Sequence, residues 1–261
     1  HLRKIMLDTN LLERRTNFRR FQQDKYPSRE KIEEIVQEAI NVAPCHSDVF
    51  GFRIEIWGPE HAEEKKILMY TGVTPAKYNA KHYLREKRGT YEEWMEDMVE
   101  YHKTDPDMFN TQVQAPYLVV LIENWQDESD WWNKKHQKYR DWRHIKAAGM
   151  FMYALALVAN RHELDASFVT RQMLNSEDAN LGHPSNIVKG FRMNGYPRIL
   201  TLLGLGYYDF SPVPGEKTYT NPDEDGWITH RNGGRYNIHT RKRDGEYKKF
   251  KPSAKDMITW K

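Results

Sequence analysis

The chain has 261 residues, of which 39% are hydrophobic and 30% charged, a composition that fits one large folded domain or two small ones and excludes a disordered chain. Forty Lys and Arg face 37 Asp and Glu, so the net charge is only +3, but residues 227–251 alone carry eight basic and two acidic side chains. The single cysteine, Cys45, excludes an intrachain disulfide and a multi-cysteine metal site.

The first half of the chain is predicted to be mainly helical. Apolar residues recur at helical spacing between Ser28 and Ala43-Pro44, which predicts a helix there. Ser28 is a good N-cap for this helix. Residues 50–57 alternate between apolar and polar side chains like a half-buried strand. Further helices are expected at 4–14, 59–70, 76–87, 91–103 and 106–114.

The second half contains the strongest hydrophobic signals. Residues 115–122 and 198–206 are continuous apolar runs, which predict strands buried on both faces. Ala147 to Ala159 has no charged residue, which predicts a central helix buried on all sides. Thirteen residues are too few for a bilayer, which needs about 20. A strand is expected at 164–170 and a short helix at 176–182.

The C-terminal segment has the pattern of a three-stranded β meander. Its expected strands, 227–231, 235–243 and 246–250, are separated by the turn signals Asn232-Gly233 and Asp244-Gly245. Because the chain's strands are not joined by regular single-helix crossovers, the order predicts an α+β fold.

The histidines, the cysteine and the Gly-Leu-Gly sequence do not form a recognisable catalytic or metal-binding motif. His46, Asp48, His136, His144, His162 and Glu163 lack metal-ligand spacing, so no metal site is expected. Cys45 beside His46 is better explained as an unreactive thiol than as a nucleophile. Gly204-Leu205-Gly206 lacks the third glycine of a dinucleotide fingerprint.

Two basic stretches leave alternatives open. Arg14 to Arg20 holds four arginines beside Thr16 and Asn17, which suits an anion site or a solvated turn. The basic meander interleaves cations and aromatics, which could serve single-stranded nucleic acid, a cofactor phosphate or a solvated tail. The helices at 75–105 are either a lid over a site or a solvated face.

Two motifs lie on either side of the first predicted helix: Arg15-Thr-Asn-Phe-Arg-Arg-Phe21 before it and Ala43-Pro-Cys-His-Ser-Asp48 after it. Together with the length of that helix, they resemble the N-terminal motifs of the FMN-dependent nitroreductase family. The Ala115-Pro116 strand, the alanine-rich helix and the Gly-Leu-Gly strand follow in the family's order. The resemblance implies a three-layer α+β fold with a mixed or antiparallel sheet around a buried core helix. Residues 1–261 would form one domain, with a helical insertion at about 75–105 and a C-terminal extension at about 212–261.

The resemblance also implies an FMN-binding homodimer with the flavin at the subunit interface. By position, Arg15, Thr16, Asn17 and Arg19 would hold the phosphate and ribityl chain. Pro44, Cys45, His46 and Asp48 would line the flavin, Asn110, Thr111 and Gln112 would contact its pyrimidine end, and Thr170 and Arg171 would lie near N5. A late basic residue would complete the phosphate site, with Lys217 the first choice and Arg241 or Arg243 as rivals.

The function implied is an oxidoreductase in which NADH or NADPH reduces FMN, and a nitroaromatic, quinone or similar acceptor reoxidises it by a ping-pong mechanism. A deiodinase-like or dehydrogenase-like member is a variant of this prediction. The alternative is a nucleic-acid-binding or interaction protein that uses the basic meander. The single cysteine and the lack of an apolar signal sequence predict a cytoplasmic protein without membrane association.

Overall fold

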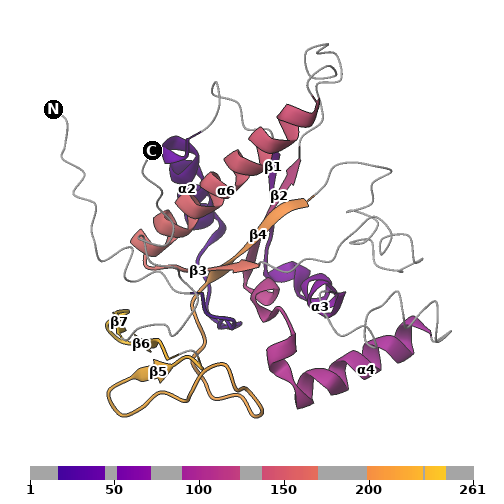
Figure 1. Ribbon diagram of the computed structural model, residues 1–261, viewed down its shortest axis with the longest axis vertical. Coiled ribbons are helices and arrows are strands. Elements are labelled where there is room, and N and C mark those ends of the chain that lie inside the picture. The colour runs from indigo at the N-terminus through magenta and orange to yellow at the C-terminus, as the bar shows by residue number, and fades with distance from the viewer. Residues whose placement is uncertain are drawn as a thin grey trace, which may run out of the picture. The chain divides into compact units, whose positions relative to one another are not determined.

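The computed structural model describes residues 17–44, 52–71, 90–123, 137–169, 199–231 and 233–244 (Figure 1). These residues fall into two compact units, one within residues 17–209 and the other within residues 210–244. The elements predicted at 4–14, 76–87, 176–182 and 246–250 lie outside the described residues.

The larger unit is built on a four-stranded antiparallel sheet with the order β1-β2-β4-β3. The strands are β1 (Phe52–Trp57), β2 (Tyr117–Glu123), β3 (Asp165–Val169) and β4 (Ile199–Gly206). The side chains from Tyr117 to Ile122 are all buried, which confirms the prediction that this strand has two covered faces.

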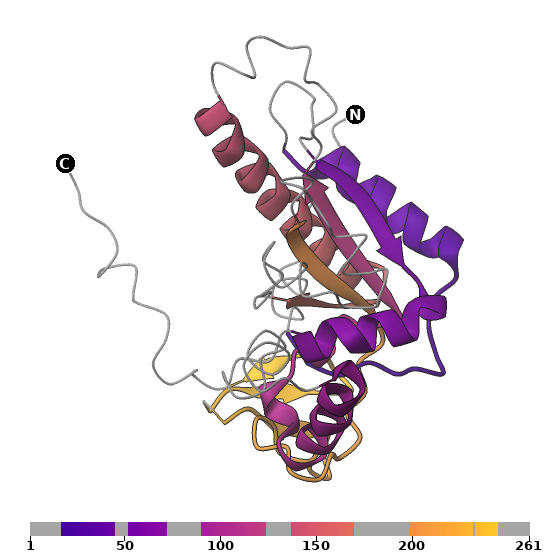
Figure 2. The ribbon, with the colours of Figure 1, turned by 90° about the vertical axis from the view of Figure 1, so that its right-hand side faces the viewer.

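The two faces of β2 contact different helices because successive side chains of a strand point in opposite directions. Tyr117, Val119 and Leu121 pack in one hydrophobic cluster with α2 (Arg29–Val42) and α6 (Gln137–Arg161). The alternate side chains pack in a second cluster with α3 (Ala62–Thr71) and α4 (Tyr91–Thr104). The sheet therefore lies between two helical layers (Figures 1 and 2), and the predicted α+β fold is confirmed.

Local signals account for the helix boundaries. The Ser28 side chain caps α2 by accepting from the backbone N–H of Lys31. Thr90 and Glu93 form a reciprocal capping box at the start of α4, which satisfies two N–H groups that have no partner inside the helix. The helix expected at 59–70 begins with a 3-10 turn, η1 (Pro59–His61), before α3. The helix expected at 106–114 consists of two short 3-10 turns, η4 (Pro106–Met108) and η5 (Thr111–Gln114).

The long helix α6 differs from its prediction on one face. Phe151, Leu155 and Ala159 are fully buried against the sheet, but Met150 and Tyr153 are each 44% exposed. The prediction of burial on all sides is therefore wrong for this face. An uninterrupted apolar sequence does not distinguish a helix buried on all sides from a helix that buries only one face within its own chain.

The C-terminal unit contains a second antiparallel sheet with the order β5-β6-β7, formed by β5 (Trp227–Thr229), β6 (Arg235–Asn237) and β7 (Arg243–Asp244). A three-stranded meander is confirmed, but its third strand is β7 in place of the predicted 246–250, which lies outside the described residues, and its second turn comes earlier than Asp244. The predicted strand 235–243 divides because the Asn237 Oδ1 accepts from the backbone N–H groups of His239 and Thr240, and Arg241 adopts a φ of 56°. These local bonds favour a turn.

Candidate functional site

The arginine-rich motif is fixed to the sheet by its two phenylalanines. Phe18 and Phe21 are 2% and 4% exposed, and their rings lie 5.5 and 5.2 Å from that of Tyr208. The backbone continues this attachment, because the N–H of Gln22 donates to the carbonyl of Tyr207 at 2.8 Å. The polar residues between these anchors are thereby held at one end of the sheet.

Asn17 occupies the free edge of β3. Among the described residues that strand pairs with β4 alone, and the Oδ1 of Asn17 accepts from the backbone N–H of Phe168 at 2.6 Å. The Ser167 hydroxyl lies within hydrogen-bond distance of both Asn17 Oδ1 (2.9 Å) and the Phe18 carbonyl (2.6 Å). The first motif is thus joined to the strand that leads to Thr170 and Arg171.

Arg19 connects the same motif to the segment before β2. Its guanidinium donates to the backbone carbonyl of Asp107, and its own carbonyl accepts from the Thr111 hydroxyl at 2.8 Å. Thr111, expected near the flavin ring, therefore lies beside Arg19, expected near the phosphate and ribityl chain. The structure thus joins one described residue of each predicted group.

Gln112 has a polar atom without a partner among the described residues. The residue is 6% exposed, and its Oε1 is buried without a hydrogen bond. A buried amide oxygen in this state costs about 1–3 kcal/mol unless a ligand or water supplies a donor. This oxygen fits the need of FMN for a hydrogen-bond acceptor at the N–H of its pyrimidine ring.

The glycines of β4 allow the surrounding segments to pack closely. A Cβ at Gly204 would lie 2.5 Å from the carbonyl oxygen of Gln112, and one at Gly206 would lie 2.8 Å from Pro116. The two glycines of Gly-Leu-Gly therefore allow β4 to pack closely against η5 and Pro116, and they do not form a phosphate-binding loop.

Lys65 is a buried residue that the sequence did not reveal. Its side chain is 2% exposed, and its Nζ donates to the carbonyls of Ala115 (2.7 Å) and Pro116 (2.9 Å), directly after η5. Burial lowers the pKa of Lys65 to about 8.

This shifted pKa gives a stability prediction. Because the folded pKa of about 8 lies below the ordinary value of 10.5, the unfolded chain binds more protons between these pH values. The wild type should therefore gain stability relative to Lys65→Met as the pH rises from 8 to 10.5. Urea unfolding of both proteins across this range measures the difference, and a constant difference would contradict the assignment.

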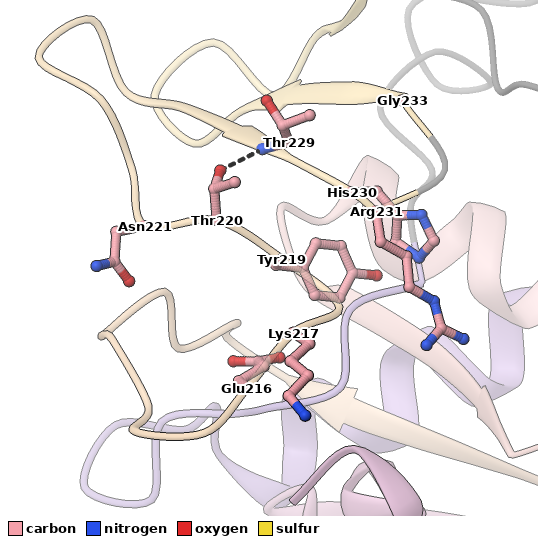
Figure 3. Close-up of a pocket in the computed structure, with 9 residues that line it drawn as sticks. All are labelled: Glu216, Lys217, Tyr219, Thr220, Asn221, Thr229, His230, Arg231 and Gly233. Carbon is pink, nitrogen blue, oxygen red and sulfur yellow. Dashed lines mark hydrogen bonds between the residues drawn. The ribbon is translucent and has the colours of Figure 1, made fainter.

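The other residues predicted to contact the flavin or its phosphate lie in several parts of the chain. Pro44 follows α2 and is exposed. Lys217 lines a pocket of the C-terminal unit (Figure 3), Arg241 stands in the turn before β7, and Arg243 begins that strand. Residues outside the described ranges are Arg15, Thr16, Cys45, His46, Asp48, Thr170 and Arg171.

His162, one of the residues considered as a metal ligand, contacts other side chains instead. Its Nδ1 lies 2.8 Å from the Lys31 Nζ, and its Nε2 lies 2.8 Å from a Glu38 carboxylate oxygen. The described ranges contain no group of three His, Cys, Asp or Glu placed to hold a metal ion. Within the same ranges, no helix has the length and apolar character needed to span a membrane.

The family model described as "Nitroreductase family" matches residues 11–207. A nitroreductase from Exiguobacterium sibiricum, solved in complex with FMN, has a TM-score of 0.51 and 14% identity, with 97% of this chain and 96% of that chain covered. A nitroreductase-like protein from Bacillus cereus has a TM-score of 0.47 and 19% identity, with 80% and 90% covered. No curated protein matches the sequence. The match over most of its length shows that the chain belongs to the nitroreductase family.

Proposed function

We propose that this chain is an FMN-dependent oxidoreductase that uses NADH or NADPH to reduce a nitroaromatic, quinone or similar acceptor by a ping-pong mechanism. The observation that carries the proposal is the meeting of Asn17, Arg19 and η5 at one end of the sheet, with the buried Gln112 oxygen among them. The Exiguobacterium sibiricum relative was solved with FMN, which supports the choice of cofactor. The single cysteine supports a reducing, cytoplasmic setting.

In this proposal the protein binds and orients the cofactor, and FMN supplies the redox chemistry when bound. Arg15, Thr16, Asn17 and Arg19 hold the phosphate and ribityl chain, because guanidinium groups suit a phosphate dianion. Asn110, Thr111 and Gln112 contact the pyrimidine end of the ring. Pro44, Cys45, His46, Asp48, Thr170 and Arg171 line the ring.

A visible absorbance spectrum of the purified protein tests the proposal. We expect a yellow protein that releases about one FMN per chain when denatured. The double variant Arg15→Ala/Arg19→Ala should lose the bound FMN, because it removes two charge-assisted contacts to the phosphate. A colourless wild type that also fails to take up added FMN would overturn the proposal.

The exposed face of α6 supports a homodimer as part of the same proposal. Ile145, Met150 and Tyr153 are 51%, 44% and 44% exposed on one helix, and Gly149 between them is also exposed. Large apolar side chains at successive turns of a helix are typical of a surface that another chain covers. A second copy of this chain would bury the stripe beside the partner's identical stripe, since twofold symmetry pairs like with like.

The double variant Met150→Glu/Tyr153→Glu should convert the dimer to a monomer. Two carboxylates placed on each side of the interface would face their symmetry mates and would have to be desolvated. Analytical ultracentrifugation measures the change. Val42→Glu, at a residue that is 58% exposed on α2, is the control and should leave the mass unchanged. A monomeric wild type, or a dimeric double variant, would exclude this face.

A further inference from the structure

The helix α3 contacts the chain on both sides of η5. Before η5, the fully buried ring of Phe109 lies 5.6 Å, centroid to centroid, from the ring of Tyr70 on α3. After η5, the Nζ of Lys65 on the same helix donates to the carbonyls of Ala115 and Pro116. Tyr70 and Lys65 are 3% and 2% exposed, so both contacts lie inside the protein. The position of η5 therefore depends on α3.

The contact with Lys65 reaches Gln112 through the backbone. The N–H of Ala115 donates to the Gln112 carbonyl at 3.2 Å, and the carbonyl of Ala115 accepts from Lys65 at 2.7 Å. Gly204 on β4 approaches the same Gln112 carbonyl so closely that a Cβ there would lie 2.5 Å from its oxygen. The turn that carries the buried Oε1 of Gln112 is thus held by α3 and by the sheet.

The contacts made by Lys65 depend on its charge. A charged ammonium group donates stronger hydrogen bonds to carbonyls than a neutral amine does, because charge-assisted bonds are roughly twice as strong. Burial lowers the pKa of Lys65 to about 8, so both forms are present at mildly alkaline pH. The same side chain is therefore a firm contact below this pH and a weaker one above it.

Few other groups near Lys65 change charge in this pH range. Glu60 and Glu64 favour the charged form of Lys65, but they do not compensate for its burial. Glu60 also pairs with Arg29 at 2.6 Å. The side chains of η5 are uncharged, and burial raises the pKa of Tyr117 at the start of β2, so this phenol stays neutral. Lys65 is thus the group whose titration should be felt by η5.

We propose that Lys65 is a positioning residue for FMN, whose ammonium group holds Gln112 where it can accept from the flavin ring and whose deprotonation weakens FMN binding. The inference rests on the proposed function and adds a control of cofactor affinity by pH. The apparent Kd for FMN then equals the Kd of the charged form divided by the fraction of Lys65 that is charged. By linkage, bound FMN should raise the pKa of Lys65.

Titration of the full-length protein, stripped of FMN, with added FMN at pH 7 and pH 9 tests the proposal by flavin fluorescence. These values lie on either side of the Lys65 pKa of about 8, so the charged fraction falls from about nine-tenths to about one-tenth. The wild-type Kd should therefore rise about tenfold. The FMN phosphate is a dianion at both values, since its second pKa is about 6.

Lys65→Met keeps most of the side-chain length and removes the charge. It should bind FMN about tenfold more weakly than the wild type at pH 7, with the same Kd at pH 9. A role in folding alone would not remove the pH dependence. The matched control is Lys66→Met, which removes the same charge from the next, half-buried position of α3 and should keep the tenfold change of the wild type.

The wild type alone can overturn the proposal, because a Kd that is equal at pH 7 and pH 9 would exclude it even if Lys65→Met failed to fold. PH dependence retained by Lys65→Met, or lost in Lys66→Met, would exclude it as well. Urea unfolding provides a second measurement: with saturating FMN, the gain in wild-type stability over Lys65→Met should begin at a higher pH than without FMN. Absence of FMN binding at both pH values would refute the proposed function together with this inference, whereas binding independent of pH would refute the inference alone.

Discussion

Replacing Asn17 with leucine is expected to lower the free energy of unfolding by about 2 kcal/mol and to abolish FMN retention. The Oδ1 of Asn17 is the acceptor for the backbone N–H of Phe168 and lies within reach of the Ser167 hydroxyl. Leucine would leave the N–H of Phe168 without that acceptor, and an unpaired buried donor costs about 1–3 kcal/mol. Urea unfolding and the FMN released on denaturation measure the two effects.

Asn17→Asp separates the structural role of this side chain from its role toward the cofactor. The carboxylate keeps an acceptor for Phe168, so the midpoint of urea unfolding should stay close to that of the wild type. Its negative charge should still weaken FMN binding, because it would lie near the phosphate dianion. Full retention of FMN by Asn17→Asp would show that this residue does not approach the phosphate, whatever the leucine variant does.

Gly204→Ala is expected to destabilise the protein by about 1–3 kcal/mol through overpacking. The added methyl group would lie 2.5 Å from the Gln112 carbonyl oxygen and 2.8 Å from the Ala115 Cβ, and the first of these is a backbone atom that cannot rotate away. Because η5 would have to shift, the variant should also bind FMN more weakly. Urea unfolding and FMN titration measure these changes.

Gly149→Ala is the matched control for this substitution. A Cβ at Gly149 would meet no atom within 4 Å, and alanine stabilises the interior of a helix by about 0.5–1 kcal/mol relative to glycine. Both glycine variants should be compared in the Met150→Glu/Tyr153→Glu background, where a second chain should not contact Gly149. Equal stability of the two variants would contradict the close contact between β4 and η5.

The predictable parts of the fold are those whose signals are local. The cap at Ser28 and the apolar run of β2 depend on neighbouring residues, and the structure has both. The exposed face of α6 was not predictable, because a side chain such as Tyr153 suits a core and an interface equally. The second turn of the meander was predicted at Asp244-Gly245, but it lies a few residues earlier, where the Asn237 side chain accepts from the backbone N–H of Thr240.

The candidate site shows the same division. The motif containing Asn17 and Arg19 could be found from sequence, since its residue types and order resemble a family pattern. Lys65 could not, because a lysine in an acid-rich helix is typical of a solvated face and its carbonyl partners lie 50 residues further along the chain. The pairing of Tyr219 with His230 could not be predicted either, since their bridge connects segments that are separate in the sequence.

The position of Asn17 on β3 also bears on the solubility of the chain. An uncovered outer strand presents N–H and C=O groups that can pair with a strand of another molecule, which is a common route to aggregation. The N-terminal motif covers β3 at Phe168, whose backbone N–H donates to the Asn17 side chain. The residues that resemble a cofactor-binding motif therefore also protect the sheet against intermolecular strand addition.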